Sequence, residues 1–151
     1  MAIELKPGLV IRYDFLWKDE DRAGREHGLK DRPCAIVSTS KTRQDGGKDV
    51  IVCPITHSPP DDKASAIEIP LKVARFLNLD EGRSWIRTHE VNTFEWSEGH
   101  IPFGMTPAHE GEWAFGQLPY ELGKKMFDQV LERSRDKSLE MVKRVAHDKP
   151  S

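Results

Sequence analysis

Four polar residues, Arg32, Thr56, Arg87 and His89, stand where apolar, β-branched segments of the chain begin or end. Such segments suit a half-buried pleated surface, so each of the four is expected at a strand end, where loops commonly carry function. An arginine fork matches phosphate oxygens, a threonine hydroxyl can donate a hydrogen bond, and a histidine exchanges protons near neutral pH. Side chains of these types can bind and act on a phosphate group.

The composition narrows the class of protein. The 151 residues suffice for one domain with its own core. The chain has 23 Lys plus Arg against 25 Asp plus Glu, so it has no overall positive charge to attract nucleic acid. Any RNA contact must therefore be local. Cys34 and Cys53 lie in apolar segments and are expected as buried free thiols. No metal-ligand spacing occurs, so no metal or cofactor is expected.

The first strand is predicted over 9–15, where apolar and polar residues alternate. Later segments predict strands after Pro33 and over 49–55, 66–71 and 84–91, with a helical turn over 73–77. The charged segment 18–31 holds two glycines and little to bury, so we expect a long mobile loop that is a candidate lid or binding element. Short strands separated by turn signals favour a barrel.

The helical period appears only near the C-terminus. Its apolar stripe begins behind Pro119, a residue favoured at the first helical position, and consists of Leu122, Met126, Phe127, Val130 and Leu131. The predicted helix covers about 119–146, either continuing or breaking near Asp136. The tail is then a partner surface or a solvated helical extension. Segment 97–116 is expected as an irregular hairpin or folded loop.

Nothing at the N-terminus resembles a signal peptide, and no apolar run approaches the ~20 residues that a membrane helix needs. We therefore expect a cytoplasmic protein that does not contact a membrane.

Five segments resemble, in order, motifs of the MazF/PemK family of toxin endoribonucleases from toxin–antitoxin modules. The family motifs are a Gly-led strand ending Val-Asp-Phe, Arg-Pro-x-x-Val-x-Ser, Val-Pro-x-Thr, an Asp-Gln-Val/Ile strand and a Gly-x-Val-x-x-Glu helix start. The matching segments are Gly8 to Phe15, Arg32 to Ser38, Cys53 to Thr56, His89 to Asn92 and Gly116 to Glu121. The order of the five is more specific than any one of them.

The resemblance implies a mainly β (α+β) fold, a small SH3-like β-barrel of the CcdB/PemK type with a C-terminal α-helix. It implies one domain over 1–151, with the barrel at about 7–118 and the helix at about 119–146. The implied function is a type II toxin that cuts single-stranded RNA without metal, by 2′-hydroxyl attack that leaves a 2′,3′-cyclic phosphate. The implied partners are RNA, a cognate antitoxin and a second copy in a homodimer.

Two other functions are compatible with this fold. One is a PemK-like barrel that binds a protein or RNA partner without cutting. The other is a topoisomerase poison, as in a related toxin of this fold, although no residues here point to it. The segment 97–113 looks like an insertion relative to the shorter family pattern.

The resemblance also assigns residues. Arg32 and Thr56 stand at the positions of the family's catalytic arginine and threonine, and PemK-type members carry an arginine at the position of Arg87. Period two would align Arg87 with His89, which replaces an aspartate presumed to be the base. We therefore expect His89 as the base, or packed on Trp85 or Trp96.

Glu26 falls near a glutamate of the family's first loop, with Arg25 and His27 as alternative occupants. The catalytic set is thus Arg32, Thr56, His89, Arg87 and Glu26. The RNA-binding set is Arg25, His27, His57 and Asn92.

Overall fold

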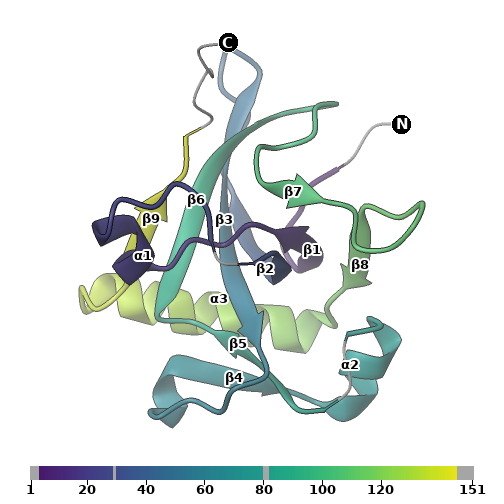
Figure 1. The fold of residues 1–151 in the computed structure, drawn as a ribbon, viewed down its shortest axis with the longest axis vertical. Coiled ribbons are helices and arrows are strands. Elements are labelled where there is room, and N and C mark those ends of the chain that lie inside the picture. The colour runs from purple at the N-terminus through teal and green to yellow at the C-terminus, as the bar shows by residue number, and fades with distance from the viewer. Residues whose placement is uncertain (1–3, 29, 80–81, 146–151) are drawn as a thin grey trace.

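A computed structural model describes residues 4–28, 30–79 and 82–145. Its strands form one nine-stranded sheet, and the long helix α3 crosses one face of it (Figure 1). The elements in chain order are β1 (Leu9–Tyr13), α1 (Lys18–Arg22), β2 (Arg32–Thr39), β3 (Gly47–Thr56), the short 3₁₀ helix η1 (Lys63–Ser65), β4 (Ala66–Ile69), α2 (Leu71–Phe76), β5 (Ser84–Arg87), β6 (Glu90–Ser97), β7 (Met105–Thr106), β8 (Ala114–Gln117), α3 (Tyr120–Arg135) and β9 (Glu140–Lys143).

The sheet is antiparallel except for one pair, β6 with β9. The long strand β3 organises it: β2 lies along one side, while β6 pairs with the first part of β3 and β5 with its last residues. The mainly β fold with a C-terminal helix is confirmed. The barrel is not closed, because within the described ranges β4 pairs only with β5 and β7 only with β1.

Both faces of the central strands are buried. One apolar cluster lies on the α3 side, where Met126 and Val130 meet the sheet, and the other lies opposite, around Tyr13, Phe94 and Trp96. Cys53 belongs to the first cluster and Cys34 to the second, and both are free and buried, as expected from the sequence. A strand that is apolar on both faces is typical of a covered sheet.

Two predicted segments differ in the structure. The charged loop expected over 18–31 begins with α1, which carries three acidic residues in its first turn and whose Glu20 accepts from the backbone N–H of Trp17 over 3.0 Å. The single strand expected over 84–91 is interrupted: β5 ends at Arg87 and β6 begins at Glu90, and both pair with β3. Thr88 lies buried between them, and its hydroxyl donates to Gln129 on α3 over 2.8 Å.

The C-terminal helix expected to about 146 ends at Arg135. Lys137 adopts a left-handed φ of 64°, and the Asp136 carboxylate accepts from the Ser138 backbone over 2.9 Å, which turns the chain. The alternative of a break near Asp136 is thus correct. The tail returns as β9 and pairs in parallel with β6.

Segment 97–116 packs against β1 rather than projecting from the fold. β7 and β8 both pair with β1, Met105 is buried, and Phe103, Trp113 and Phe115 are half-buried, whereas Ile101 stays 44% exposed. No helix of the described ranges has the length and apolar character needed to span a membrane.

Candidate active site

The ends of three strands meet at one pocket. Antiparallel pairing sets Pro54 of β3 opposite Cys34 of β2 on one side, and Thr56 of β3 opposite Trp85 of β5 on the other. Arg32, Thr56 and Arg87 therefore line a common pocket of about 460 Å³. Three predicted catalytic residues from distant parts of the chain are brought together.

Arg87 and Thr56 are joined by direct hydrogen bonds. The Nε of Arg87 donates to the Thr56 hydroxyl oxygen over 3.1 Å, and its Nη2 donates to the Ser58 carbonyl over 2.6 Å. The Thr56 hydroxyl lies 3.4 Å from the same carbonyl, the long limit for a donated bond. This network fixes both side chains and leaves the hydroxyl proton weakly held.

Arg32 is held by an aromatic ring and keeps an unused donor. Its guanidinium carbon lies 5.4 Å from the centroid of the Trp17 ring, a cation–π geometry. Its Nε is buried and has no hydrogen-bond partner among the residues described. A buried donor without a partner is costly, so an anion placed beside it would gain a strong hydrogen bond.

The pocket is locally positive although the chain carries a formal net charge of −2. Lys30 joins the two arginines in its lining, whereas Asp31 is its one carboxylate among the described residues. Asp31 accepts from the Thr106 hydroxyl over 3.0 Å and lies 4.0 Å from the Nε of Arg12. The lining thus carries three cationic side chains against one carboxylate among the residues described.

Of the predicted histidines, His57 lines this pocket. Its Nδ1 lies 3.0 Å from the Arg83 carbonyl oxygen and 3.3 Å from the Ser84 hydroxyl, and the side chain is exposed. A histidine in such a place can move protons for a bound substrate.

His89 does not line the pocket. The interruption between β5 and β6 breaks the period-two alignment, and the Nε2 of His89 lies 3.5 Å from the Glu90 carboxylate. The hydrogen bond with Glu90 raises the pKa of His89, against the opposing effect of burial, and the Ser65 backbone adds to the rise. The expected placement of His89 beside Arg87 in the site is therefore corrected.

The loop residues also lie outside the pocket lining. The side chains of Glu26, Arg25 and His27 are exposed. The Nδ1 of His27 lies 2.8 Å from Asp14, and Arg25 donates to the His27 carbonyl over 3.1 Å. These contacts hold the loop against the end of β1, so the expected lid is anchored there.

Asn92, expected as an RNA-binding residue, is fully buried, so its side chain is not at the surface. Its amide donates to the Leu16 carbonyl over 2.8 Å and its oxygen accepts from the Leu16 N–H over 2.9 Å. It fastens the segment after β1 to β6.

The sequence analysis did not single out Arg144, which follows β9 and is 5% exposed. It donates to the Asp14 carbonyl and carboxylate, to Asn92 over 3.1 Å and to the Glu26 carbonyl over 2.9 Å. Once β9 is recognised as a strand, period two places Arg144 on the same face as the buried Val142, which is the signal that could have found it.

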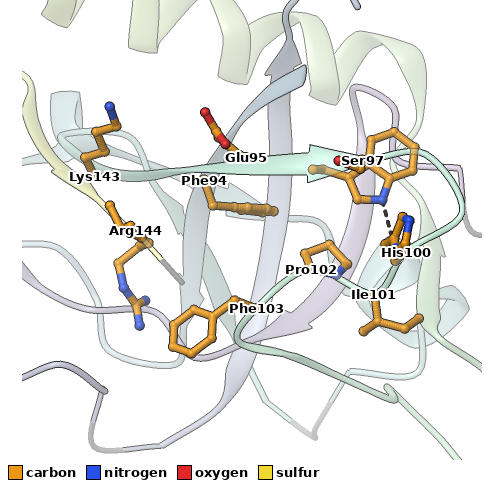
Figure 2. Close-up of a pocket in the computed structure, with 11 residues that line it drawn as sticks. Phe94, Glu95, Ser97, His100, Ile101, Pro102, Phe103, Lys143 and Arg144 are labelled. Carbon is orange, nitrogen blue, oxygen red and sulfur yellow. Dashed lines mark hydrogen bonds between the residues drawn. The ribbon is translucent and has the colours of Figure 1, made fainter. Parts of the chain in front are cut away.

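A second pocket of about 440 Å³ lies between β6, the loop 97–103 and Arg144. Figure 2 shows Phe94, Ile101, Pro102 and Phe103 among the side chains that line it. The indole N–H of Trp96 donates to the His100 carbonyl over 2.9 Å. It shares no lining residue with the Arg32 pocket, so the two are separate.

The geometry thus defines a small, mainly β protein with a pocket of about 460 Å³ at its strand ends, lined by Lys30, Arg32 and Arg87. The family model of the PemK-like, MazF-like toxin of type II toxin-antitoxin system matches residues 11–104, more than half of the chain, and the chain belongs to this family. Neither the curated proteins nor the solved structures contain a significant match. The matched range includes Arg32, Thr56 and Arg87 and excludes β8, α3 and β9.

Proposed function

We propose that this toxin is a metal-independent endoribonuclease that cuts single-stranded RNA in the cytoplasm and leaves a 2′,3′-cyclic phosphate. The observation that carries the proposal is the convergence of Arg32, Thr56 and Arg87 on one pocket, with the Arg32 Nε lacking a hydrogen-bond partner within the described ranges.

In this reaction the 2′-oxygen forms a bond to the adjacent phosphorus while the bond from phosphorus to the 5′-oxygen breaks. Negative charge grows on the non-bridging phosphate oxygens, and preorganised donors there lower the barrier. Arg32 supplies its unused donors to those oxygens. Arg87 holds the Thr56 oxygen, so the Thr56 proton can turn from Ser58 to the phosphate.

Two proton transfers complete the step: one from the 2′-hydroxyl and one to the departing 5′-oxygen. His57 is the histidine in the pocket lining and is the group we assign to one of these transfers. His89, held by Glu90 outside the lining, takes no part in this assignment.

The test incubates purified protein with long RNA in EDTA and maps the new ends. Cyclic phosphates and 5′-hydroxyl ends are expected. Arg32→Ala should abolish the cuts, whereas Arg43→Ala, which removes an arginine of the hairpin before β3, should not. Intact RNA with the parent protein, or identical cuts with Arg32→Ala, would overturn the proposal.

A non-cutting RNA-binding barrel is the second candidate. The observation that favours it is the contact of the His89 side chain with Glu90. His89 stands at the position of the family's presumed base, but its Nε2 pairs with this carboxylate. In that case fluorescence anisotropy should show that the parent protein binds RNA and that Arg32→Ala abolishes the binding. End mapping should find no new RNA ends.

We also propose the family's partners, a cognate antitoxin and a second copy of the chain. Two aromatic side chains support a partner surface: Phe76 at the end of α2 is 77% exposed, and Tyr120 at the start of α3 is 78% exposed. Light scattering of the parent and of a Phe76→Glu variant tests the dimer. A parent that stays monomeric at micromolar concentration contradicts it.

A further inference from the structure

A smaller hollow adjoins the Arg32 pocket. It has a volume of about 310 Å³, and Asp31, Arg32 and Pro33 line both cavities. Its remaining lining residues are Arg12, Asn78, Ala108, His109 and Phe115. An RNA strand with one phosphate at Arg32 continues in both directions, and a nucleotide of one flank can reach this hollow because the two cavities share Arg32.

The hollow contains the groups that recognise a nucleobase. Phe115 offers a half-buried ring, and the His109 ring stands edge-on to it at 5.1 Å and 83°. The Nε2 of His109 is buried without a hydrogen-bond partner in the part of the chain described. Bases of single-stranded RNA are recognised by such combinations of aromatic faces and hydrogen-bonding groups.

Two further groups complete this chemistry. Asn78 presents an exposed side chain from a left-handed turn with φ of 58°, and an amide can pair with both donors and acceptors of a base. Arg12 lines the hollow, its Nε lies 4.0 Å from Asp31, and its side chain is exposed, so its guanidinium can contact a backbone phosphate.

The position of His109 is set before any ligand binds. Its backbone N–H donates to the Glu112 carbonyl over 3.2 Å, and the Glu112 N–H donates back over 3.0 Å. This bridge lies in the insertion before β8, outside the range 11–104 that the family model matches. The hollow is therefore built in part from residues beyond the matched segment.

We propose that this hollow is a specificity subsite that binds the base of the nucleotide next to the cleaved phosphate. The base packs on Phe115, and the Nε2 of His109 and the Asn78 amide bind its edge. The proposal rests on the proposed function, which supplies RNA as the ligand.

Two variants isolate the hydrogen-bonding groups. His109→Phe keeps a flat ring beside Phe115 and removes the nitrogen, while Asn78→Gly removes the amide and tolerates a positive φ. Mapped cut sites should lose base preference at one position beside the cut, and KM should rise about tenfold with a smaller change in kcat, because a base contact acts in binding. Arg43→Ala is the control.

The outcomes separate the subsite from the cutting activity. If the parent cuts RNA and both variants keep its base preference and KM, the subsite is overturned and the nuclease stands. If the parent does not cut, the proposed function fails, and the subsite is judged by NMR titration with the four nucleoside monophosphates. A response of the His109 ring signals supports it, and no response overturns it. If His109→Phe does not fold, Asn78→Gly decides alone.

Discussion

The Nε of Arg87 at the end of β5 donates to the hydroxyl oxygen of Thr56 at the end of β3, over 3.1 Å. The two residues are 31 positions apart, and the pairing of β3 with β5 brings them together. The arginine thereby orients the threonine side chain. The Thr56 hydroxyl accepts a hydrogen bond from Arg87, and its own proton is left for another partner.

Thr56→Val should lower kcat about 100-fold, because losing one preorganised donor to the transition state typically costs 10²–10³ in rate. The isosteric valine removes both the acceptor for Arg87 and the donor for phosphate. Thr56→Ser, which keeps the hydroxyl, should retain most of the activity. Single-turnover cleavage of a defined RNA measures both. Equal rates for the valine and serine variants would remove Thr56 from the mechanism.

Arg144→Met should destabilise the protein by about 3–5 kcal/mol, because breaking a buried ion pair leaves its partner charge uncompensated. The partner here is Asp14, 3.1 Å away. Pairing the change with Asp14→Asn should recover part of the loss. Urea unfolding measures the free energy of unfolding of each variant. Arg43→Met is the control, because it also removes an arginine with carboxylate partners. A loss under 1 kcal/mol contradicts the assigned role.

The strands were predictable because their signals are local. Alternation and β-branched runs marked β1, β2 and β3, and Pro119 marked the start of α3. Arg32, Thr56 and Arg87 were identified by family motifs that occupy strand ends. Their convergence on one pocket follows from strand register.

The rest depends on contacts that sequence patterns do not carry. The sequence pattern predicts a helix at β9, because Met141, Val142 and Val145 continue the apolar stripe of a helix. The segment is a strand in the structure because it pairs with β6. Likewise, the period-two alignment of His89 with Arg87 assumed an unbroken strand, but β5 ends at Arg87 and the chain bends at His89 before β6 begins. In both cases long-range packing overrides the local pattern.

The pair of His89 and Glu90 should make stability depend on pH. The hydrogen bond with Glu90 raises the folded pKa of His89, so its contribution is complete below the ordinary pKa of about 6.5 and is lost as pH rises through the folded value. Burial raises the pKa of Glu90, but the bonds from His89 and Lys18 outweigh it and the net shift is downward, so that contribution is lost in acid.

The melting temperature of Glu90→Gln should therefore fall below that of the parent by about 1–3 °C near pH 6, since partly exposed pairs contribute little. The difference should shrink toward about pH 8.5, as the pH rises through the raised pKa of His89. Calorimetry at both pH values measures it. NMR titration should place the pKa of His89 lower in the variant. A difference that grows as pH rises contradicts the sign.

Matched variants of two histidines decide which one transfers the proton. His57→Gln should reduce kcat/KM about 100-fold, the low end of what a general acid or base contributes, because His57 lines the pocket. His89→Gln should leave kcat/KM within about threefold, and the acid limb of its pH–rate profile should stay in place, because His89 is held by Glu90 outside the lining. Rates measured from pH 5 to 9 on one RNA test both variants. A profile that collapses with His89→Gln and survives His57→Gln would return the base to His89 and require that its side chain turn toward Arg87 when RNA binds.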